Sequence, residues 1–351
     1  MQLAECGILR TFAALGISRG PLPAAIGLAL VLAFQAGLRA DQEGGSASGA
    51  APGVRSFHVQ GQVWVIAGAG GNVIVQAGNT KAAGPGAGEG VLVVDTGAAG
   101  MTAALLAEIK QITPGRIEYI VNTSGDPEHV GGNEQLATPQ IDFLGTPGSF
   151  SGPGVKIIGH EAVLPRMSLP GPDGKASYPA VAWPNATYSL AQRRVFFNDE
   201  PIVVTHVPAA HSDGDSFVHF RRSDVIATGD LFDATRYPVI ERARGGTVAG
   251  IIAGLNRVLD LMVPRYNQEG GTYVVPGHGR VCDQHDVLEY RDMLAIVRDR
   301  IKAAVEKGWT LAQVKAQRPT LDYDARWGTE TGPWTTDMFI ETIYAEYART
   351  R

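Results

Sequence analysis

The sequence predicts an α/β fold in which β-strands and helices form the layers of a sandwich. Short aliphatic and aromatic runs alternate with glycine-rich turns from Phe57 onward, which indicates a strand-rich region. Helical patterns are interspersed among these strands, and the chain beyond about Asp286 is mostly helical. The 351 residues, 44% of them hydrophobic, suffice for one large domain with an extension or for two small domains.

The N-terminal residues differ in composition from the rest of the chain. Arg10 and Arg19 precede an apolar run at 21–38, and a small residue follows it. This pattern is typical of a secretory leader, so we expect a leader at 1–40 and a periplasmic or secreted protein. The alternative is an uncleaved membrane anchor, because the apolar run is close to the length that spans a bilayer. The small polar residues at 41–56 predict a flexible linker.

Glycine-rich turns separate the first predicted strands. QVWVIA at 62–67 and NVIVQ at 72–76 flank the glycines of 68–71, as expected of a hairpin. VLVVD at 91–95 is a continuous apolar run, which is typical of a buried strand. The spacing of apolar residues at 101–112 then predicts an amphipathic helix.

The later elements continue this alternation. Further strands are predicted at 117–122, 202–206, 225–228 and 273–275, and further helices at 247–261 and 288–307. The glycine clusters contain neither GxGxxG at a helix start nor GxxxxGK(S/T), so they predict turns and not a nucleotide site. A formal net charge of −5 gives no basic surface for nucleic acid. We expect the main domain at 57–290 and a helical C-terminal extension at 291–351.

Four short segments rich in His, Asp and Glu each follow a predicted strand. They are NTSGDPEHVGGN at 122–133, HSDGD at 211–215, TGD at 228–230 and PGHG at 276–279. Residues at strand ends can converge at one edge of a sheet, which is how distant segments assemble a metal site. A single histidine beside glycine is more often a turn or core residue. All four segments together, each after a strand, predict a metal centre.

The order of these segments resembles that of the metallo-β-lactamase superfamily over roughly residues 57–290. The superfamily's first motif, T-H-x-H-x-D-H-x-G-G-N, corresponds to T-S-G-D-P-E-H-V-G-G-N at 123–133. VLVVDTG at 91–97 also matches the superfamily's early strand and loop. The resemblance implies an αββα sandwich and the activity of a metal-dependent hydrolase. Beyond about residue 290 only general helical character is shared.

The resemblance also implies the metal ligands. They are Asp126, Glu128, His129, His211, Asp230 and His278. In the alignment, Ser124 and Asp126 take the places of two histidines, Glu128 takes that of the aspartate, and Asp230 corresponds to the bridging aspartate. A neutral hydroxyl is a poor ligand for a divalent ion, so we expect Ser124 beside the ligands and not among them.

The ligand types point to hydrolysis by an activated water. Three imidazoles and up to three carboxylates favour zinc, with iron or manganese as alternatives because carboxylates are harder ligands. A bound metal lowers the pKa of water from about 15.7 to about 7, which provides a hydroxide nucleophile. Glu128 or Asp126 is the expected catalytic group that assists this water. The expected substrate is a small molecule with an ester, thioester, lactam or similar bond.

Two other functions remain open at this point. The altered first motif is also compatible with a catalytically degenerate, exported metal-binding or binding module, and redox chemistry is a third alternative. Residues 145–183 are rich in Pro, Gly and Ser, and we expect them to form a mobile loop over the site. Asp213 and Asp215 are expected to form turns or to orient a ligand histidine. The remaining histidines are interpreted as structural on strands (His206, His219) or as surface and loop residues (His58, His160, His285).

Overall fold

Two β-sheets form the centre of the fold. The computed structural model describes residues 53–78, 90–138, 154–171, 174–266 and 270–348. The predicted leader at 1–40 and most of the predicted linker at 41–56 lie outside these described residues. Within them, no helix combines the length and the apolar character that crossing a membrane requires.

The first sheet has seven described strands in sequential order. They are β1 (Arg55–Gln60), β2 (Val63–Ala69), β3 (Gly71–Ala77), β4 (Val91–Val94), β5 (Ile117–Val121), β6 (Lys156–His160) and β7 (Ala186–Tyr188). The pairs from β1 to β4 are antiparallel, and those from β4 to β7 are parallel. The parallel half therefore directs the carboxyl ends of β4, β5 and β6 to one edge.

The second sheet has five described strands. Their order across the sheet is β12 (Tyr273–His278), β11 (Val225–Asp233), β10 (Ser216–Phe220), β9 (Glu200–His206) and β8 (Gln192–Phe197). Only β11 and β12 pair in parallel, and the other neighbours are antiparallel. The ends of β11 and β12 therefore lie side by side.

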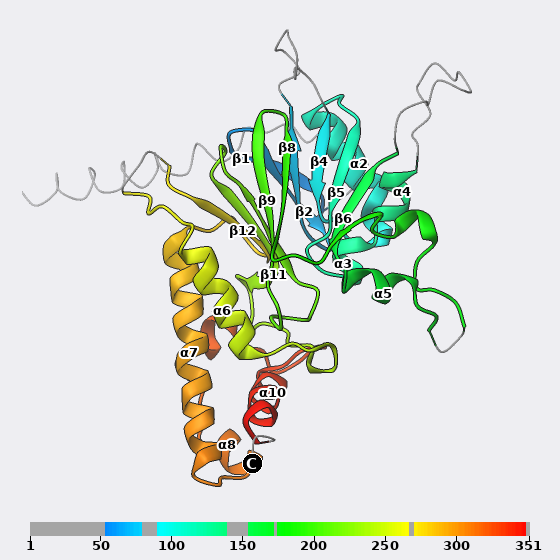
Figure 1. The fold of residues 1–351 in the computed structure, drawn as a ribbon. Helices are drawn as coiled ribbons and strands as arrows, with labels where there is room; N and C mark the ends of the chain where they lie inside the picture. Colours follow the sequence, from blue (N-terminus) through cyan, green and yellow to red (C-terminus); the bar gives the residue numbers. More distant parts are fainter. Residues whose placement is uncertain (1–52, 79–89, 139–153, 172–173, 267–269, 349–351) are drawn as a thin grey trace, which may run out of the picture. The chain divides into compact units, whose positions relative to one another are not determined.

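The two sheets and the helices outside them form four layers (Figure 1), and apolar side chains pack between these layers. In β4, Leu92 and Val94 face the second sheet, whereas Val91 and Val93 face the helices, so the whole strand is buried. Burial on both faces explains why this strand is an unbroken aliphatic run. The helices outside the first sheet include α2 (Thr102–Ile112) and α4 (Asn133–Ala137), and those outside the second include α6 (Val248–Leu259). The predicted αββα sandwich is confirmed.

The C-terminal helices continue the layer outside the second sheet. They are α7 (Gln284–Glu306), α8 (Leu311–Ala316), α9 (Asp324–Trp327) and α10 (Thr336–Ala348). Asp283 begins α7 with a capping box, accepting from the backbone N–H of Asp286, whose carboxylate accepts in return. One apolar cluster runs from Phe232 through Tyr290 to Phe339. The predicted domain boundary after residue 290 lies inside α7.

The prediction of a loop at 145–183 is wrong for much of the part of this range that the structure describes. Residues 145–153 lie outside the described residues, but β6 then pairs with β5 and β7, and α5 (Val163–Ser168) follows. Ile157 and Ile158 of β6 are fully buried on opposite faces of the sheet. Strands β1, β7 and β8 were also not indicated by the sequence, because they are partly exposed or short.

Candidate metal centre

The four predicted segments converge at the strand ends, and all six predicted ligands fall into two groups. The first group is Glu128, His129, Asp230 and His278, and the second is Asp126, His211 and Glu241. Within each group, potential ligand atoms lie within 4.8 Å of one another. Short helix α3 (Pro127–Val130), which follows β5 after a five-residue connection, presents Glu128 and His129, with Pro127 at the first helical position.

In the first group, the imidazoles of His129 and His278 each have a buried nitrogen atom that faces a carboxylate. The Nε2 atoms of His129 and His278 are buried and have no hydrogen-bond partner among the described residues. Nε2 of His129 lies 3.0 Å from Oδ1 of Asp230, and Nε2 of His278 lies 3.6 Å from Oε1 of Glu128. Burying such nitrogens without a partner is unfavourable, and a cation among them supplies the missing interaction. Two imidazoles and two carboxylates therefore fit a divalent metal ion.

Asp95, at the end of β4, holds His129 in position. Its Oδ2 lies 2.7 Å from Nδ1 of His129 and accepts from Oγ1 of Thr123 at 2.6 Å, while its Oδ1 accepts from the backbone N–H of Thr123 at 2.8 Å. The carboxylate of Asp95 accepts the proton on Nδ1, so a metal ion that displaces the proton on Nε2 can bind that nitrogen. Asp95 adopts a left-handed backbone conformation with φ of 61°, which is uncommon for a residue with a side chain.

Opposing effects set the pKa of His129. Burial alone lowers it, but the carboxylates of Asp230 and Asp95 outweigh burial and raise the pKa well above its ordinary value. The sequence did not predict the role of Asp95. Its position after the strand of VLVVDTG was the available signal.

Asp230 lies between the two groups of residues. Its Oδ1 faces His129, and its Oδ2 lies 3.5 Å from Oγ of Ser124 and 3.8 Å from Nδ1 of His211. Burial raises the pKa of this carboxyl, but the neighbouring histidines outweigh burial and lower it overall. Gly229 adopts φ of 51°, and a Cβ there would lie 2.3 Å from Oγ1 of Thr123. Only glycine therefore lets β11 approach the first motif so closely.

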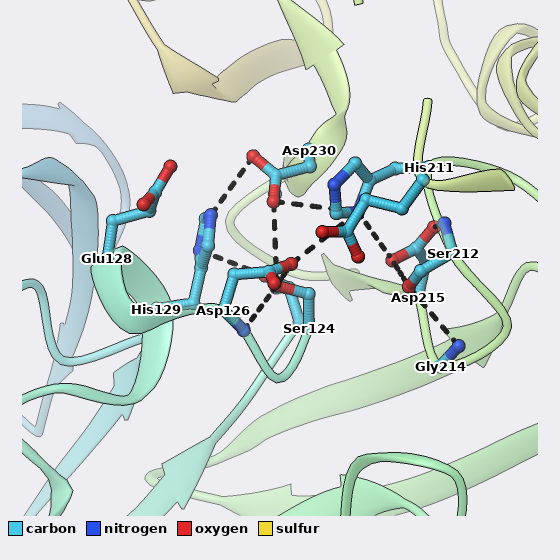
Figure 2. A network of polar contacts seen from close by, with 12 residues as sticks. Ser124, Asp126, Glu128, His129, His211, Ser212, Gly214, Asp215 and Asp230 are labelled. Atoms are coloured by element: carbon cyan, nitrogen blue, oxygen red, sulfur yellow. Dashed lines mark hydrogen bonds and ion pairs between the residues drawn. The ribbon is translucent and has the colours of Figure 1, made fainter. Parts of the chain in front are cut away.

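The second group forms a hydrogen-bonded network with protein partners (Figure 2). Oδ1 of Asp126 accepts from Nη1 of Arg244 at 2.7 Å, and Oδ2 accepts from Oγ of Ser124 at 3.2 Å. The same Nη1 lies 2.9 Å from Oε2 of Glu241. The sequence did not predict Glu241 or Arg244, because the stretch that contains them carries no metal-ligand motif.

Asp215 orients His211, as the sequence analysis expected. Nδ1 of His211 lies 3.3 Å from Oδ1 of Asp215, which also accepts from Oγ of Ser212 at 2.6 Å. Burial lowers the pKa of His211, but Asp230 and Asp215 outweigh burial and raise it to about 10. Asp213 forms an ion pair with Arg166, which also donates to Ser212 at 3.1 Å.

The interpretation of His160 as a surface or loop residue is wrong. It lies in β6, is 7% exposed, and stacks on His206 with ring centroids 3.6 Å apart and an interplanar angle of 1°. Nδ1 of His206 lies 3.0 Å from the carbonyl oxygen of Asp215, so this stack reaches the loop that carries His211. Burial is the main reason why the pKa values of both stacked histidines are lowered.

A pocket of about 190 Å³ opens beside both groups. Its lining residues are Asp126, Pro127, Glu128, His211, Asp230, Asp233, Arg236, Val239 and Glu241. Glu128 is half-buried, and its carboxylate stands apart from the hydrogen-bonded network in Figure 2. The contact with His278 is the main reason why the pKa of Glu128 is lowered, so this carboxylate is ionised at neutral pH.

Solved structures share this fold. The stereoselective inverting sec-alkylsulfatase Pisa1 from Pseudomonas sp. aligns with a TM-score of 0.59 and 14% identity, over 84% of this chain and 50% of that one. A double mutant of the same sulfatase aligns with a TM-score of 0.58 and 13% identity, over the same shares. This chain therefore spans about half the length of these two proteins. A metallo-β-lactamase from Pontibacter korlensis aligns with a TM-score of 0.49 and 17% identity, over 69% of this chain and 99% of that one.

The family comparison agrees with the fold. No curated protein matches the sequence. The family model of the metallo-beta-lactamase superfamily matches residues 86–141, which contain the early strand and the first motif. The layered fold and the convergence of the four segments agree with this match, which shows a resemblance to the metallo-β-lactamase superfamily over that part of the chain.

Proposed function

We propose that the protein is a metal-dependent hydrolase that cleaves an ester, thioester, lactam or similar bond of a small molecule. The observation that carries this proposal is the pair of buried, unpartnered Nε2 atoms of His129 and His278, which face the carboxylates of Glu128 and Asp230. These four residues would hold the ion, for which their nitrogen and oxygen donors favour zinc. The adjoining pocket provides space for a substrate.

The ion would supply the chemistry that the side chains lack. When bound, a divalent ion lowers the pKa of a water molecule to about 7 and polarises the bond to be cleaved. The protein's part is to orient the reactants. Asp95 fixes the tautomer of His129 through the 2.7 Å contact at Nδ1, and Asp230 stands between the two groups.

Glu128 is better placed than Asp126 to hold a water molecule for attack. Both oxygens of Asp126 are engaged, by Arg244 and by Ser124. Glu128 borders the pocket, and His278 is its ion-pair partner among the described residues. A positioned, ionised carboxylate can accept a hydrogen bond from water and then take up its proton.

Chelator-sensitive turnover tests this proposal. The purified protein is assayed with chromogenic carboxylic esters, a sulfate ester, thioesters and a cephalosporin, each with zinc, manganese or iron. Sulfate esters are included because the fold is shared with an alkylsulfatase. Turnover that a chelator abolishes and metal restores supports the hydrolase. Absence of such turnover across the panel favours the degenerate binding module instead.

A further inference from the structure

We propose that Arg244 takes the place of a metal ion in the second group, so that the centre binds one ion per chain, at the first group. This inference rests on the metal centre of the proposed function. It concerns which of the two groups can accept an ion, and the two groups differ in how their polar atoms are satisfied.

One nitrogen of Arg244 already bridges the second group. Its Nη1 lies 2.7 Å from Oδ1 of Asp126 and 2.9 Å from Oε2 of Glu241. These are charge-assisted hydrogen bonds, and a guanidinium does not lose its proton in a protein. A metal ion between the same carboxylates would have to lie about 2.0–2.2 Å from their oxygens. A second cation there would overlap the arginine and be repelled by it.

Ser124 adds a second donor to this group. It is fully buried, and its Oγ donates to Oδ2 of Asp126 at 3.2 Å and lies 3.5 Å from Oδ2 of Asp230. A histidine at this position, as in the superfamily motif, would offer a lone pair to a metal. The hydroxyl instead directs a proton at the carboxylates, which reduces their need for a metal cation.

The first group shows the opposite pattern. Its two Nε2 atoms, of His129 and His278, are buried without partners. In the described structure, no buried side-chain nitrogen or oxygen of Ser124, Asp126 or His211 lacks a hydrogen-bond partner. The first group thus presents two buried nitrogen atoms that a metal ion can bind, whereas the carboxylates of the second group already bond to Arg244 and Ser124.

The backbone holds Arg244 against the site. The N–H of Glu241 donates to the carbonyl of His211 at 2.9 Å, and the N–H of Asp213 donates to the carbonyl of Arg244 at 2.9 Å. A Cβ on Gly246 would lie 2.1 Å from the carbonyl oxygen of His211, so glycine is needed for this close approach. Arg244 is therefore carried on a segment fixed to the His211 loop, although its own side chain is 43% exposed.

The metal count per chain tests the proposal. Each protein is saturated with Zn²⁺, freed of excess ion by gel filtration and measured by plasma mass spectrometry. We expect one ion in the wild type and in Arg244→Lys, which keeps the charge. Arg244→Met and Arg244→Ala remove the charge and should rise towards two ions. Arg236→Met is the matched control, because Arg236 lines the same pocket but pairs with Asp233, and it should remain at one.

Circular dichroism first identifies which variants are folded, and the bound ions are counted only for those. Two ions in the wild type would overturn the proposal, and so would a count that stays at one in folded Arg244→Met and Arg244→Ala. The outcome is separable from that of the proposed function. If the wild type binds one ion but shows no turnover, the proposed hydrolase function fails and the inference about Arg244 stands. If it binds two ions and shows turnover, the hydrolase function stands and the inference fails. A wild type that binds no ion overturns both.

Discussion

Oδ2 of Asp95 lies 2.7 Å from Nδ1 of His129, although the two residues are 34 positions apart and come from different strand ends. This contact links the early strand of the first sheet to the first motif. It determines which nitrogen of His129 carries the proton and which one faces the other residues of the first group. The strength of metal binding should therefore depend on a residue that is not itself a ligand.

We predict that Asp95→Asn weakens metal affinity by about 10- to 100-fold, which is typical when the carboxylate behind a ligand histidine is altered. The amide is nearly isosteric but neutral, so it holds the Nδ1 proton less strongly. Competition with a chromogenic chelator measures the affinity. Asp199→Asn, at an exposed turn, serves as the control and should leave the affinity unchanged. Unchanged affinity in Asp95→Asn would show that this contact is only structural.

Substitution of a metal ligand should reduce metal binding more than substitution of the neighbouring Ser124. We predict that Asp230→Ala and His278→Ala each remove most of the bound metal, whereas Ser124→Ala retains it. The first two remove donor atoms of the first group, while the serine hydroxyl hydrogen-bonds to carboxylates. Metal content after dialysis, measured by plasma mass spectrometry, distinguishes them. Equal loss in all three variants would mean that Ser124 belongs to the ion's coordination sphere.

The stacked histidines should make stability depend on pH. Burial lowers the pKa values of His160 and His206 in the folded protein, so the unfolded chain takes up protons at higher pH than the folded one. Their contribution is complete above the unfolded pKa of about 6.5 and is lost as the pH falls through the lower folded values.

We predict that His160→Gln reduces the drop in Tm between pH 7.5 and pH 5.5 by roughly 1–3 °C, since only one titrating group is removed from a large domain. Differential scanning fluorimetry measures the two temperatures. His285→Gln, on the exposed first turn of α7, should retain the full drop. The same drop in His160→Gln as in the wild type would exclude the stack as a source of this pH dependence.

The parts of the site that could be predicted from the sequence are those in short motifs at the ends of strands. The strands of 91–95, 117–122 and 225–228 are short, mainly apolar runs, and polar residues at their ends and after them assemble the site. The role of Arg244 was not predicted because Arg244 and Asp126 are 118 residues apart in the sequence, and only the folded chain brings them into contact. Asp95 lies in a recognisable motif but is not itself a ligand, so only its contact with His129 shows that it orients this histidine.

His160 shows a different reason for a wrong prediction. It lies in a stretch rich in Pro and Gly, for which the sequence favours a loop. The strand β6 forms there because β5 and β7 provide partners for its backbone on both sides, and because Ile157 and Ile158 fill the two apolar layers. Tertiary packing therefore overrides the local composition.

The last prediction concerns the carboxylate that borders the pocket. Glu128→Gln keeps the size of the side chain but removes its ability to take up a proton. If Glu128 assists the attacking water, turnover should fall by roughly a hundredfold or more, in line with the usual contribution of a positioned acid or base. The steady-state rate is measured on whichever substrate shows chelator-sensitive turnover, together with the metal content of the variant.

The metal content separates the two possible roles of Glu128. A slow variant that keeps its metal supports the role of a proton acceptor, whereas parallel loss of metal and rate indicates that Glu128 serves chiefly as a ligand. Glu134→Gln is the matched control, because this exposed residue lies on the neighbouring helix α4 and should leave both quantities unchanged. Full activity in Glu128→Gln would contradict the assignment. Asp126 would then be the remaining carboxylate to test, and its function would require Arg244 to release one of its oxygens.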